Sequence, residues 1–295
     1  MLPEPPQVVS EVARCEFLRQ RDDRYPASLT DLAQPPGELF WLGDLNVLHR
    51  PAVSIVGTRD STSYGERTAR NLSRDLVRAG VCVVSGMARG IDATAHRSAL
   101  ENGGATIAVL GTGIDVAYPA GHRPLHAAIA AHGLVLSENP PGASAQRGSF
   151  PKRNRIIAAL GRITVVVEAG HKSGALNTAS HALDLGRVVA AVPGQIDSEQ
   201  SAGANQLIRD GAVVITSSAD LLALLGLAAP PTERTLPSLP DVEQRVWEAV
   251  GFNFTDSDAV GLKTGLAPAE CLAAITSLEL MGLVECSLAG EIRRR

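Results

Sequence analysis

Three cations are crowded into one short stretch of the sequence. Within "FPKRNRIIAALG" (residues 150–161), Lys152, Arg153 and Arg155 fall in four consecutive positions, just ahead of an apolar run. The apolar run predicts a helix beginning near Asn154, and a helix N-terminus disfavours positive charge because of the helix dipole. A bound anion would relieve that cost. Taken alone, the cluster equally fits a solvated helix face.

The loops that follow the predicted strands carry further candidates. "GTRDSTSYG" (57–65) contains Arg59 and also Gly57, which allows close backbone approach, and "GHKSGALNTA" (170–179) contains Lys172. Ligands of an open parallel sheet bind beyond the carboxyl ends of the strands, so these loops are expected to share one groove. Backbone N–H groups and helix N-termini attract phosphates, and arginine can hold one phosphate in bidentate fashion. Several successive phosphates would fit, which favours a nucleic-acid strand over a mononucleotide.

Catalytic and metal-binding motifs are weak by comparison. Glu168, at the end of a predicted strand, is the best acid–base candidate, but anchoring the loop that follows is the favoured interpretation. Asp92, in the first turn of a predicted helix, fits a dipole partner or a satisfied buried carboxylate. His122 and His126 have the i, i+4 spacing of a metal pair but lack an acidic partner, so solvent-facing histidines are favoured. With no P-loop or G-x-S-x-G motif either, the residues favour no particular enzyme class, and we expect no metal and no cofactor.

The candidate loops can share one groove only if a parallel sheet brings the carboxyl ends of their strands together. From residue 53 on, short apolar runs alternate with longer amphipathic segments, a pattern typical of parallel βαβ units. Because the runs are almost wholly apolar, helices are expected on both faces of the sheet. The expected fold class is α/β, a Rossmann-like doubly wound, mostly parallel sheet. Its strands are predicted at 53–56, 81–85, 105–111, 134–138, 163–169, 188–193 and 212–216.

The chain divides into several predicted parts. Prolines without apolar periodicity in 228–240 mark a linker. After it, three pieces with helical spacing and a short strand fit a winged helix. Ahead of the sheet, "FWL" (40–42) belongs to a lead-in that should pack against the main domain. We therefore expect an N-terminal remnant (1–23), a Rossmann-like domain (24–226), a Pro-rich linker (227–240) and a small C-terminal winged-helix domain (241–295).

Composition limits the class of protein. The 295 residues carry a formal net charge of -4 and are 45% hydrophobic, which is typical of a globular chain. No run of about 18 uninterrupted apolar residues and no signal-like N-terminus is present, so we expect a cytoplasmic protein without a membrane partner. Residues 145–175 contain six cations and one acid, whereas 235–295 contain nine acids and five cations. The basic middle and the acidic tail predict separate roles.

An ordered set of motifs gives the sequence a family resemblance. "VGTR", "SGMARGIDATAH", "SENPPG", "FPKRNRIIAALG", "VVVEAGHKSGALNTA" and "VPGQIDSEQSAGANQLIRDGA" together resemble the DNA processing protein A family (DprA, also called Smf) over residues 25–217. The tail is similar to the winged-helix domain of many members. The resemblance implies a non-enzymatic protein of natural transformation. Such a protein binds and protects incoming single-stranded DNA, forms a homodimer through the Rossmann-like domain, and helps load RecA recombinase past single-strand-binding protein.

The resemblance also assigns DNA-binding residues, and these are combined with the candidates from the loops after the strands. We expect phosphate contacts to dominate, with steep salt dependence, and Phe150 is a candidate for stacking on a base. Because the tail is acidic, the winged-helix domain is expected to add little DNA affinity and to serve protein contact or regulation. The predicted DNA-binding residues are Gly57, Arg59, Gly86, Phe150, Lys152, Arg153, Asn154, Arg155, Lys172, Ser173, Gly174 and Thr178.

Two alternatives stay open. Nucleotide phosphoribohydrolases of the lonely-guy type share this fold superfamily and hold "PGGxGTxxE" where this chain has 167–179, but the paired glycines and the glutamate of that motif are missing here. An interaction scaffold without a ligand of its own is the other class. Charge reversal of Arg59 and Lys152 separates the classes, because only a nucleic-acid binder would lose affinity uniformly across base sequences.

Overall fold

The computed structural model describes residues 16–146, 148–227, 239–287 and 290–294. The chain divides into two compact units, Met1–Pro231 and Thr232–Arg295, each of which is described separately. Most of the predicted N-terminal remnant and most of the Pro-rich linker lie outside the described residues. Within those residues, no helix is long and apolar enough to cross a membrane.

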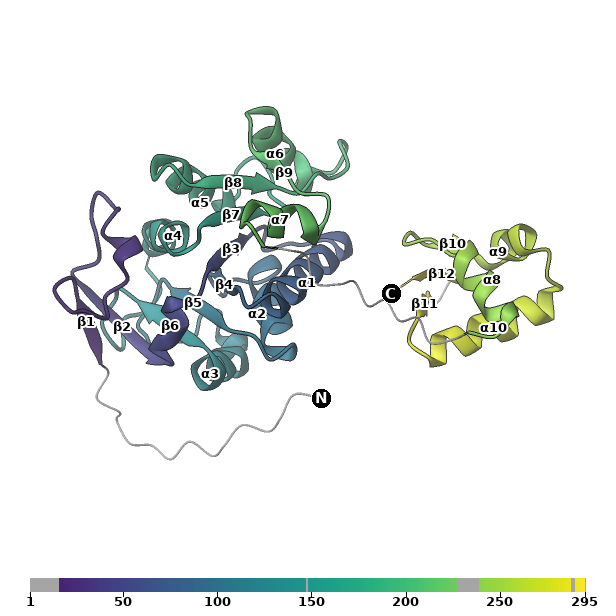
Figure 1. The fold of residues 1–295 in the computed structure, drawn as a ribbon, viewed down its shortest axis with the longest axis horizontal. Helices are drawn as coiled ribbons and strands as arrows, with labels where there is room; N and C mark the ends of the chain where they lie inside the picture. The colour runs from purple at the N-terminus through teal and green to yellow at the C-terminus, as the bar shows by residue number, and fades with distance from the viewer. Residues whose placement is uncertain (1–15, 147, 228–238, 288–289, 295) are drawn as a thin grey trace. The chain divides into compact units, whose positions relative to one another are not determined.

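A nine-stranded sheet forms the centre of the larger unit (Figure 1). Its order is β1-β2-β6-β5-β4-β3-β7-β8-β9, with β3 to β9 parallel and with β1 and β2 added antiparallel at one edge. The α/β, Rossmann-like fold class is confirmed, and each predicted strand overlaps one of β3 to β9. The strands are β1 (Phe17–Arg19), β2 (Glu38–Gly43), β3 (Ala52–Val56), β4 (Cys82–Ser85), β5 (Thr106–Leu110), β6 (Leu134–Ser137), β7 (Ile163–Val166), β8 (Val188–Ala191) and β9 (Val213–Val214).

Helices cover both faces of this sheet, as the apolar strands predict. Val53 and Ile55 of β3 pack in a cluster with residues of α1, α2 and α7, whereas Ala52 and Val56 pack with residues of α4 and α5. Successive side chains of a strand point to opposite faces, so a strand covered on both sides must be apolar throughout. The helices are α1 (Ser63–Arg78), α2 (Ile91–Glu101), α3 (Arg123–His132), α4 (Ser149–Leu160), α5 (Gly174–Asp184), α6 (Glu199–Arg209) and α7 (Ser218–Leu224).

Two boundaries differ from the sequence prediction. α4 begins at Ser149 rather than near Asn154, because Gly148, with φ +94°, turns the chain directly into the helix. The cations of "FPKRNR" therefore lie inside the first two turns of α4, not ahead of it. The "FWL" lead-in forms β2, in which Trp41 lies opposite Leu136 of β6, so the lead-in extends the sheet as well as packing on it.

The chain changes direction across the sheet at β3. Strands β4 to β6 follow on one side of β3, and β7 to β9 lie on the other. The loops that leave β3 and β7 therefore diverge to opposite faces, and the crevice between them is where open α/β sheets bind ligands. The glycine-rich stretches that follow these two strands in the sequence both begin at this crevice.

In residues 239–287 and 290–294, the smaller unit contains three helices and a three-stranded antiparallel sheet of order β10-β12-β11. Val246, Val260, Leu278, Val284 and Ile292 are fully buried in its own core. This arrangement confirms the predicted winged helix. Its elements are α8 (Asp241–Ala249), β10 (Thr255–Asp256), α9 (Ser257–Thr264), α10 (Pro268–Leu280), β11 (Val284–Cys286) and β12 (Glu291–Arg294).

Candidate nucleic-acid interface

The loops after β3 and β7 are joined at the crevice. The backbone N–H of Thr58 donates to the carbonyl oxygen of Glu168 at 2.7 Å. Gly57 lies in the tight space beside this bond, where a Cβ atom would sit 2.5 Å from Ile91 Cγ1 and 3.0 Å from the Glu168 carbonyl oxygen. A side chain does not fit there. Glycine at this position therefore lets the loop carry Arg59 to the carboxyl edge of the sheet, where Arg59 is exposed.

Glu168 anchors the start of α1. Its buried carboxylate accepts hydrogen bonds from the backbone N–H of Thr62, at 3.0 Å, and from the Thr62 hydroxyl. Gly65 makes room for it, because a Cβ there would clash with Glu168 Oε2. A carboxylate at a helix N-terminus is stabilised by the free N–H groups and by the helix dipole. The carboxylate thus anchors the loop after β3, not the loop that follows Glu168 as expected, and these contacts involve no acid–base chemistry.

His122 and His126 are not the solvent-facing pair that their spacing favours. His122 is buried, with Nδ1 bonded to the Met87 carbonyl at 3.0 Å, and Nε2 of the half-buried His126 is bonded to the Ile114 carbonyl at 2.9 Å. Each ring is held by the loop after a different strand, which explains the burial. Among the described residues, no group of three or more His, Cys, Asp or Glu side chains is placed to hold a metal ion.

Arg153 turns inward from α4. Only 6% of its surface is exposed, and its Nη1 donates to the carbonyl oxygens of Gly86, at 2.8 Å, and of Val109. Burial lowers the pKa of Arg153 to about 10; the Asp92 carboxylate opposes that shift and Arg59 adds to it. The guanidinium thus ties α4 to the ends of β4 and β5. The direct DNA contact predicted for Arg153 stays a prediction, and this burial disfavours it.

Asp92 balances the buried guanidinium. Its Oδ2 accepts hydrogen bonds from the backbone N–H groups of Gly86 and Ala88, at 3.2 and 3.3 Å. Burial raises the pKa of Asp92, whereas Arg153 and these N–H groups lower it. Gly86 is needed beside the pair, because a Cβ there would lie 2.6 Å from Arg153 Nη2 and 2.8 Å from Asp92 Oδ2. Asp92 is therefore the satisfied buried carboxylate that the sequence suggests.

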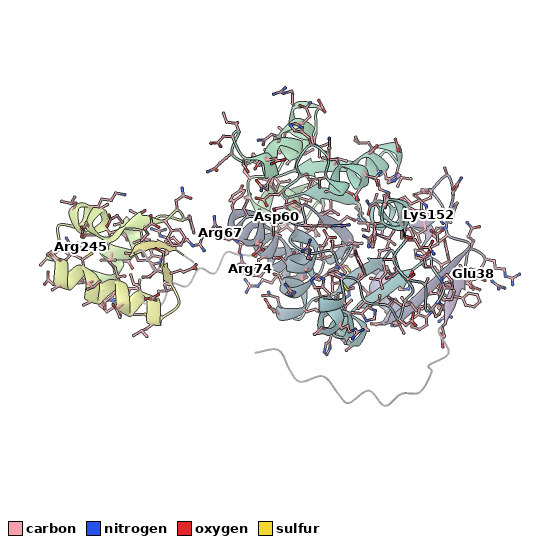
Figure 2. All side chains as sticks on the ribbon, turned by 180° about the vertical axis from the view of Figure 1, so that it is seen from behind. Glu38, Asp60, Arg67, Arg74, Lys152 and Arg245 are labelled. Atoms are coloured by element: carbon pink, nitrogen blue, oxygen red, sulfur yellow. The ribbon has the colours of Figure 1, made fainter. Side chains whose placement is uncertain are left out.

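Lys152 and Arg155 share one carboxylate that sequence reasoning missed. Lys152 Nζ lies 3.1 Å from Glu138 Oε2, and Arg155 Nη2 lies 2.7 Å from Glu138 Oε1. The i, i+3 spacing puts both cations on one side of α4, next to the loop that leaves β6. The Lys152 side chain is 60% exposed and that of Arg155 is 12% exposed. Figure 2 labels Lys152 on the larger unit. Lys152 can therefore meet a ligand at the surface, while Arg155 is mostly enclosed.

Asn154 links α4 to the start of α5. Its Nδ2 donates to the Gly174 carbonyl at 3.2 Å and to Asn177 Oδ1 at 3.1 Å. Ser173 caps α5 by accepting from the N–H of Ala175 at 3.3 Å. Gly174 faces open space, with no atom within 4 Å of the place where its Cβ would be. A ligand can thus approach the backbone at the start of α5 closely.

An aromatic platform lies beside the exposed cations. The guanidinium carbon of Arg59 is 5.6 Å from the centroid of the Phe150 ring, and the rings of Phe150 and Tyr118 are 5.0 Å apart at 36°. Gly111 leaves room for Phe150, because a Cβ there would lie 2.8 Å from Phe150 Cδ1. Sequence reasoning did not select the exposed Tyr118. The signal for it was an aromatic residue in the loop after β5, since aromatic rings stack on bases.

The predicted residues fall into an exposed and a buried set. A ligand at this edge of the sheet meets guanidinium, ammonium and aromatic groups, a combination suited to phosphates and bases. Of the buried residues, Arg153 and Asn154 hold α4 in place instead. Exposed or partly exposed are Gly57, Arg59, Phe150, Lys152, Arg155, Lys172, Ser173 and Gly174, and buried are Gly86, Arg153, Asn154 and Thr178.

Both units match known family models. The model described as DNA recombination-mediator protein A matches residues 16–226. The model described as DprA winged helix domain matches residues 230–290. Together they span nearly all of the chain from the start of the sheet onward.

Individual relatives are similar over most of this chain. A DNA processing protein DprA of Streptococcus pneumoniae is 44% identical over 206 residues, which cover 68% of this chain and 71% of that protein. A DprA protein of Mycobacterium tuberculosis is 46% identical over 242 residues, which cover 80% of this chain and 62% of that protein. This chain therefore spans less than two thirds of the length of the mycobacterial relative.

Solved structures share the fold of the larger unit. The X-ray structure of the Streptococcus pneumoniae DprA matches with a TM-score of 0.69 at 42% identity and covers 72% of this chain and 74% of that chain. DNA processing protein A of Helicobacter pylori matches with a TM-score of 0.66 at 30% identity, covering 72% and 95%. The Helicobacter structure is described as showing how that protein binds single-stranded DNA.

Proposed function

This chain belongs to the DNA recombination-mediator protein A family, and on that premise we propose that it binds single-stranded DNA at the carboxyl edge of its sheet. The observation that carries the proposal is the Arg59 guanidinium packed over the Phe150 ring at 5.6 Å. It sets a phosphate-binding charge beside a base-stacking surface in the ligand crevice of the fold. The single-stranded DNA binding of the Helicobacter relative supports this choice of ligand.

Three exposed cations hold the phosphates of the strand in this proposal. Arg59 and Lys172 have no carboxylate partner among the described residues. Lys152 pairs with Glu138, but the Lys152 side chain is largely exposed, and Glu138 keeps Arg155 as a partner if Lys152 leaves it. A phosphate can therefore compete for Lys152. Phe150 and Tyr118 supply the stacking surface.

The buried residues position this surface. Arg153 fastens α4 to the loop after β4 and to the end of β5, and Asn154 fastens it to α5. These bonds fix the first two turns of α4, from which Phe150 and Lys152 project. We assign Arg153 and Asn154 to positioning, with direct phosphate contact left to the exposed cations.

The finer functions rest on the family resemblance. We propose that the bound strand is incoming DNA in natural transformation, which the protein protects, and that it helps load RecA recombinase, with single-strand-binding protein as a further partner. We also propose a homodimer formed through the Rossmann-like domain, in the cytoplasm. Because this chain spans 62% of the mycobacterial relative, these activities are proposals for the whole protein.

We propose no enzymatic activity. Glu168, the best acid–base candidate of the sequence, is hydrogen-bonded to Thr62 at the start of α1. Incubation with nucleoside monophosphates should therefore release no free base. Turnover to free base would favour the phosphoribohydrolase alternative.

Mobility-shift assays with single- and double-stranded oligonucleotides at two salt concentrations test DNA binding. We expect a preference for single strands and weaker binding at the higher salt. R59E and K152E should lose affinity on every base sequence. R209E, at the exposed C-terminus of α6, is the charge-matched control and should bind normally. Preference for the duplex, or an equal loss in R209E, would contradict the proposal.

A further inference from the structure

A second group of arginines lines a pocket between α1 and α2. The pocket has a volume of about 150 Å³, and Arg70, Arg89 and Arg97 line it together with Glu66 and Glu101. Three cations and two acids leave it one net positive charge. None of these residues belongs to the platform around Phe150, so the pocket is a separate feature of the same unit.

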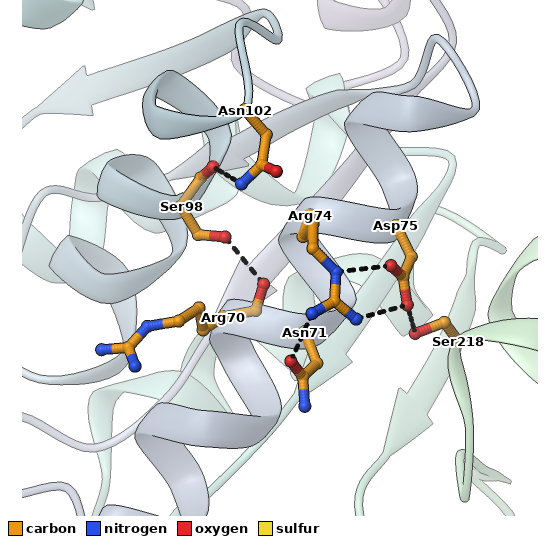
Figure 3. A network of polar contacts seen from close by, with 7 residues as sticks. All are labelled: Arg70, Asn71, Arg74, Asp75, Ser98, Asn102 and Ser218. Atoms are coloured by element: carbon orange, nitrogen blue, oxygen red, sulfur yellow. Dashed lines mark hydrogen bonds and ion pairs between the residues drawn. The ribbon is translucent and has the colours of Figure 1, made fainter. Parts of the chain in front are cut away.

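None of the three guanidinium groups is bonded to another described side chain. In the part of the chain that the structure describes, the side chains of Arg70, Arg89 and Arg97 have neither a hydrogen-bond acceptor nor an ion-pair partner. The next arginine on α1 shows the contrast, because Arg74 donates to the Asp75 carboxylate at 2.8 and 3.3 Å (Figure 3). Each guanidinium offers five N–H donors. The pocket therefore holds many donors that only a ligand or water can satisfy.

The packing of α1 on α2 sets two of these arginines on facing helices. The Ser98 hydroxyl of α2 donates to the backbone carbonyl of Arg70 at 2.7 Å, and Arg97 is the neighbour of Ser98 in sequence. Figure 3 shows this bond, with the Arg70 guanidinium pointing away from Arg74 and Asp75. Because the bond uses the backbone carbonyl, a side-chain substitution at Arg70 leaves it intact.

The pocket adjoins the proposed DNA site. Gly90, which also lines the pocket, has φ +72°. A Cβ there would clash with the Thr58 carbonyl oxygen and would lie 3.1 Å from that of Arg59. The backbone that carries Arg59 therefore touches the wall of the pocket, and the exposed Arg89 directly precedes Gly90 in the chain. A strand that lies on Arg59 can continue past Arg89.

We propose that the pocket of Arg70, Arg89 and Arg97 binds a further phosphate of the same DNA strand. The proposal rests on the proposed function and extends its site. Arginine pairs with phosphate through two parallel N–H donors, so three unpaired guanidinium groups suit this ligand. Because the pocket adjoins the backbone of Arg59, a strand that contacts Arg59 can reach the pocket with a further phosphate, whereas a mononucleotide has no second phosphodiester to place there. The pocket therefore favours DNA over a mononucleotide.

The test compares short and long single strands. Oligonucleotides of about 4 and about 16 nucleotides bracket the usual size of single-strand sites. R70Q/R97Q should weaken binding of the long strand and reduce its salt slope by roughly 0.7 for each phosphate that is no longer neutralised, while the short strand binds as before. R78Q, exposed on α1 outside the pocket, is the matched control. An unchanged long-strand slope in R70Q/R97Q would overturn the proposal.

Two further measurements separate the alternatives. E101Q removes a carboxylate from the pocket and should tighten binding of the long strand; weaker or unchanged binding would count against a phosphate there. Calorimetric titration with inorganic phosphate alone should give the same heat for the natural chain and for R70Q/R97Q. A heat seen with the natural chain and lost in the variant would mean that the pocket binds free phosphate. Such a heat, with unchanged long-strand affinity, would assign the pocket to free phosphate and overturn the DNA assignment. Failure of the proposed function looks different, because R59E and K152E would then bind even the short strand normally.

Discussion

The guanidinium of Arg59 lies over the ring of Phe150, although the loop after β3 carries one residue and α4 carries the other. A cation held over an aromatic face is attracted by the ring quadrupole. The contact therefore orients both groups before any ligand arrives. It also joins the two functions that a single-strand site needs, a charge for the phosphate and a flat surface for the base.

Replacing Phe150 by alanine should weaken single-strand binding by about 1–3 kcal/mol, the usual loss when a stacking ring is removed. The salt slope should not change, because no charge is lost. R59Q should instead lower the slope by roughly 0.7. Fluorescence anisotropy over a salt series measures both quantities, with thermal unfolding as the control for folding. A lower slope in F150A would show that the ring acts by holding Arg59 rather than by stacking.

Replacing Arg153 by methionine should destabilise the larger unit by about 3–5 kcal/mol, because Asp92 is left as a buried charge without its partner. R153M/D92N removes that charge as well and should recover much of the loss. Urea unfolding at neutral pH measures the free energy of unfolding of both variants. Equal stability of R153M and R153M/D92N would show that the unpaired Asp92 charge does not cause the loss of stability.

Acid should destabilise the fold through His96. Burial, together with the charges of Arg153 and His122, lowers the pKa of this histidine to about 3, while its Nδ1 bonds the Thr106 hydroxyl at 2.7 Å. Between pH 6.5 and about 3 the unfolded chain binds a proton that the folded chain excludes. The free energy of unfolding should therefore fall with decreasing pH in this window, by about 1.4 kcal/mol per unit, and be fully retained above it.

His96→Gln should flatten that part of the stability curve, whereas His132→Gln should not. His132 is exposed at the end of α3 and serves as the matched control. Denaturant unfolding at several pH values gives the curves. The raised pKa of Asp92 acts in the opposite direction, so only the difference between H96Q and the natural chain isolates the histidine. Parallel curves for the two would contradict the assignment.

The motif "FPKRNR" supplied part of the candidate site, including Lys152 and Arg155. In a helix of 3.6 residues per turn, Lys152 and Arg155 share a side and Arg153 points about 100° away from Lys152. All three cations were nevertheless expected at the DNA, because the helix was expected to begin near Asn154 instead of Ser149. The motif alone therefore gave no helical register for them. It did not predict which side faces the sheet, because that depends on Asp92, which α2 brings to the same place from far away in the sequence.

The parallel strands could be predicted from the sequence for a physical reason. That reason does not apply to β1, to β2 or to the residues that contact α4 at the site. A sheet covered on both faces requires apolar runs, which stand out in the sequence. Glu138 and Tyr118 lie in the loops after β6 and β5, and these loops come close to α4 only when the strands assemble into the sheet. No local pattern marks such partners. The position of the loops therefore predicted where the site lies. The role of each residue depends on tertiary contacts, which the sequence does not show.

Removing the winged-helix unit tests what the acidic tail contributes. Its helix α10, which corresponds to the helix that related motifs place in a DNA groove, carries Glu270 and Glu279 and no cation. Leu272 and Leu280 of α10 are 61% and 85% exposed. A chain ending at Leu236 should therefore keep nearly the full single-strand affinity and the same salt slope, because the proposed phosphate contacts all lie in the larger unit. Anisotropy measures both, and loss of nearly all binding on truncation would show that the tail holds the DNA.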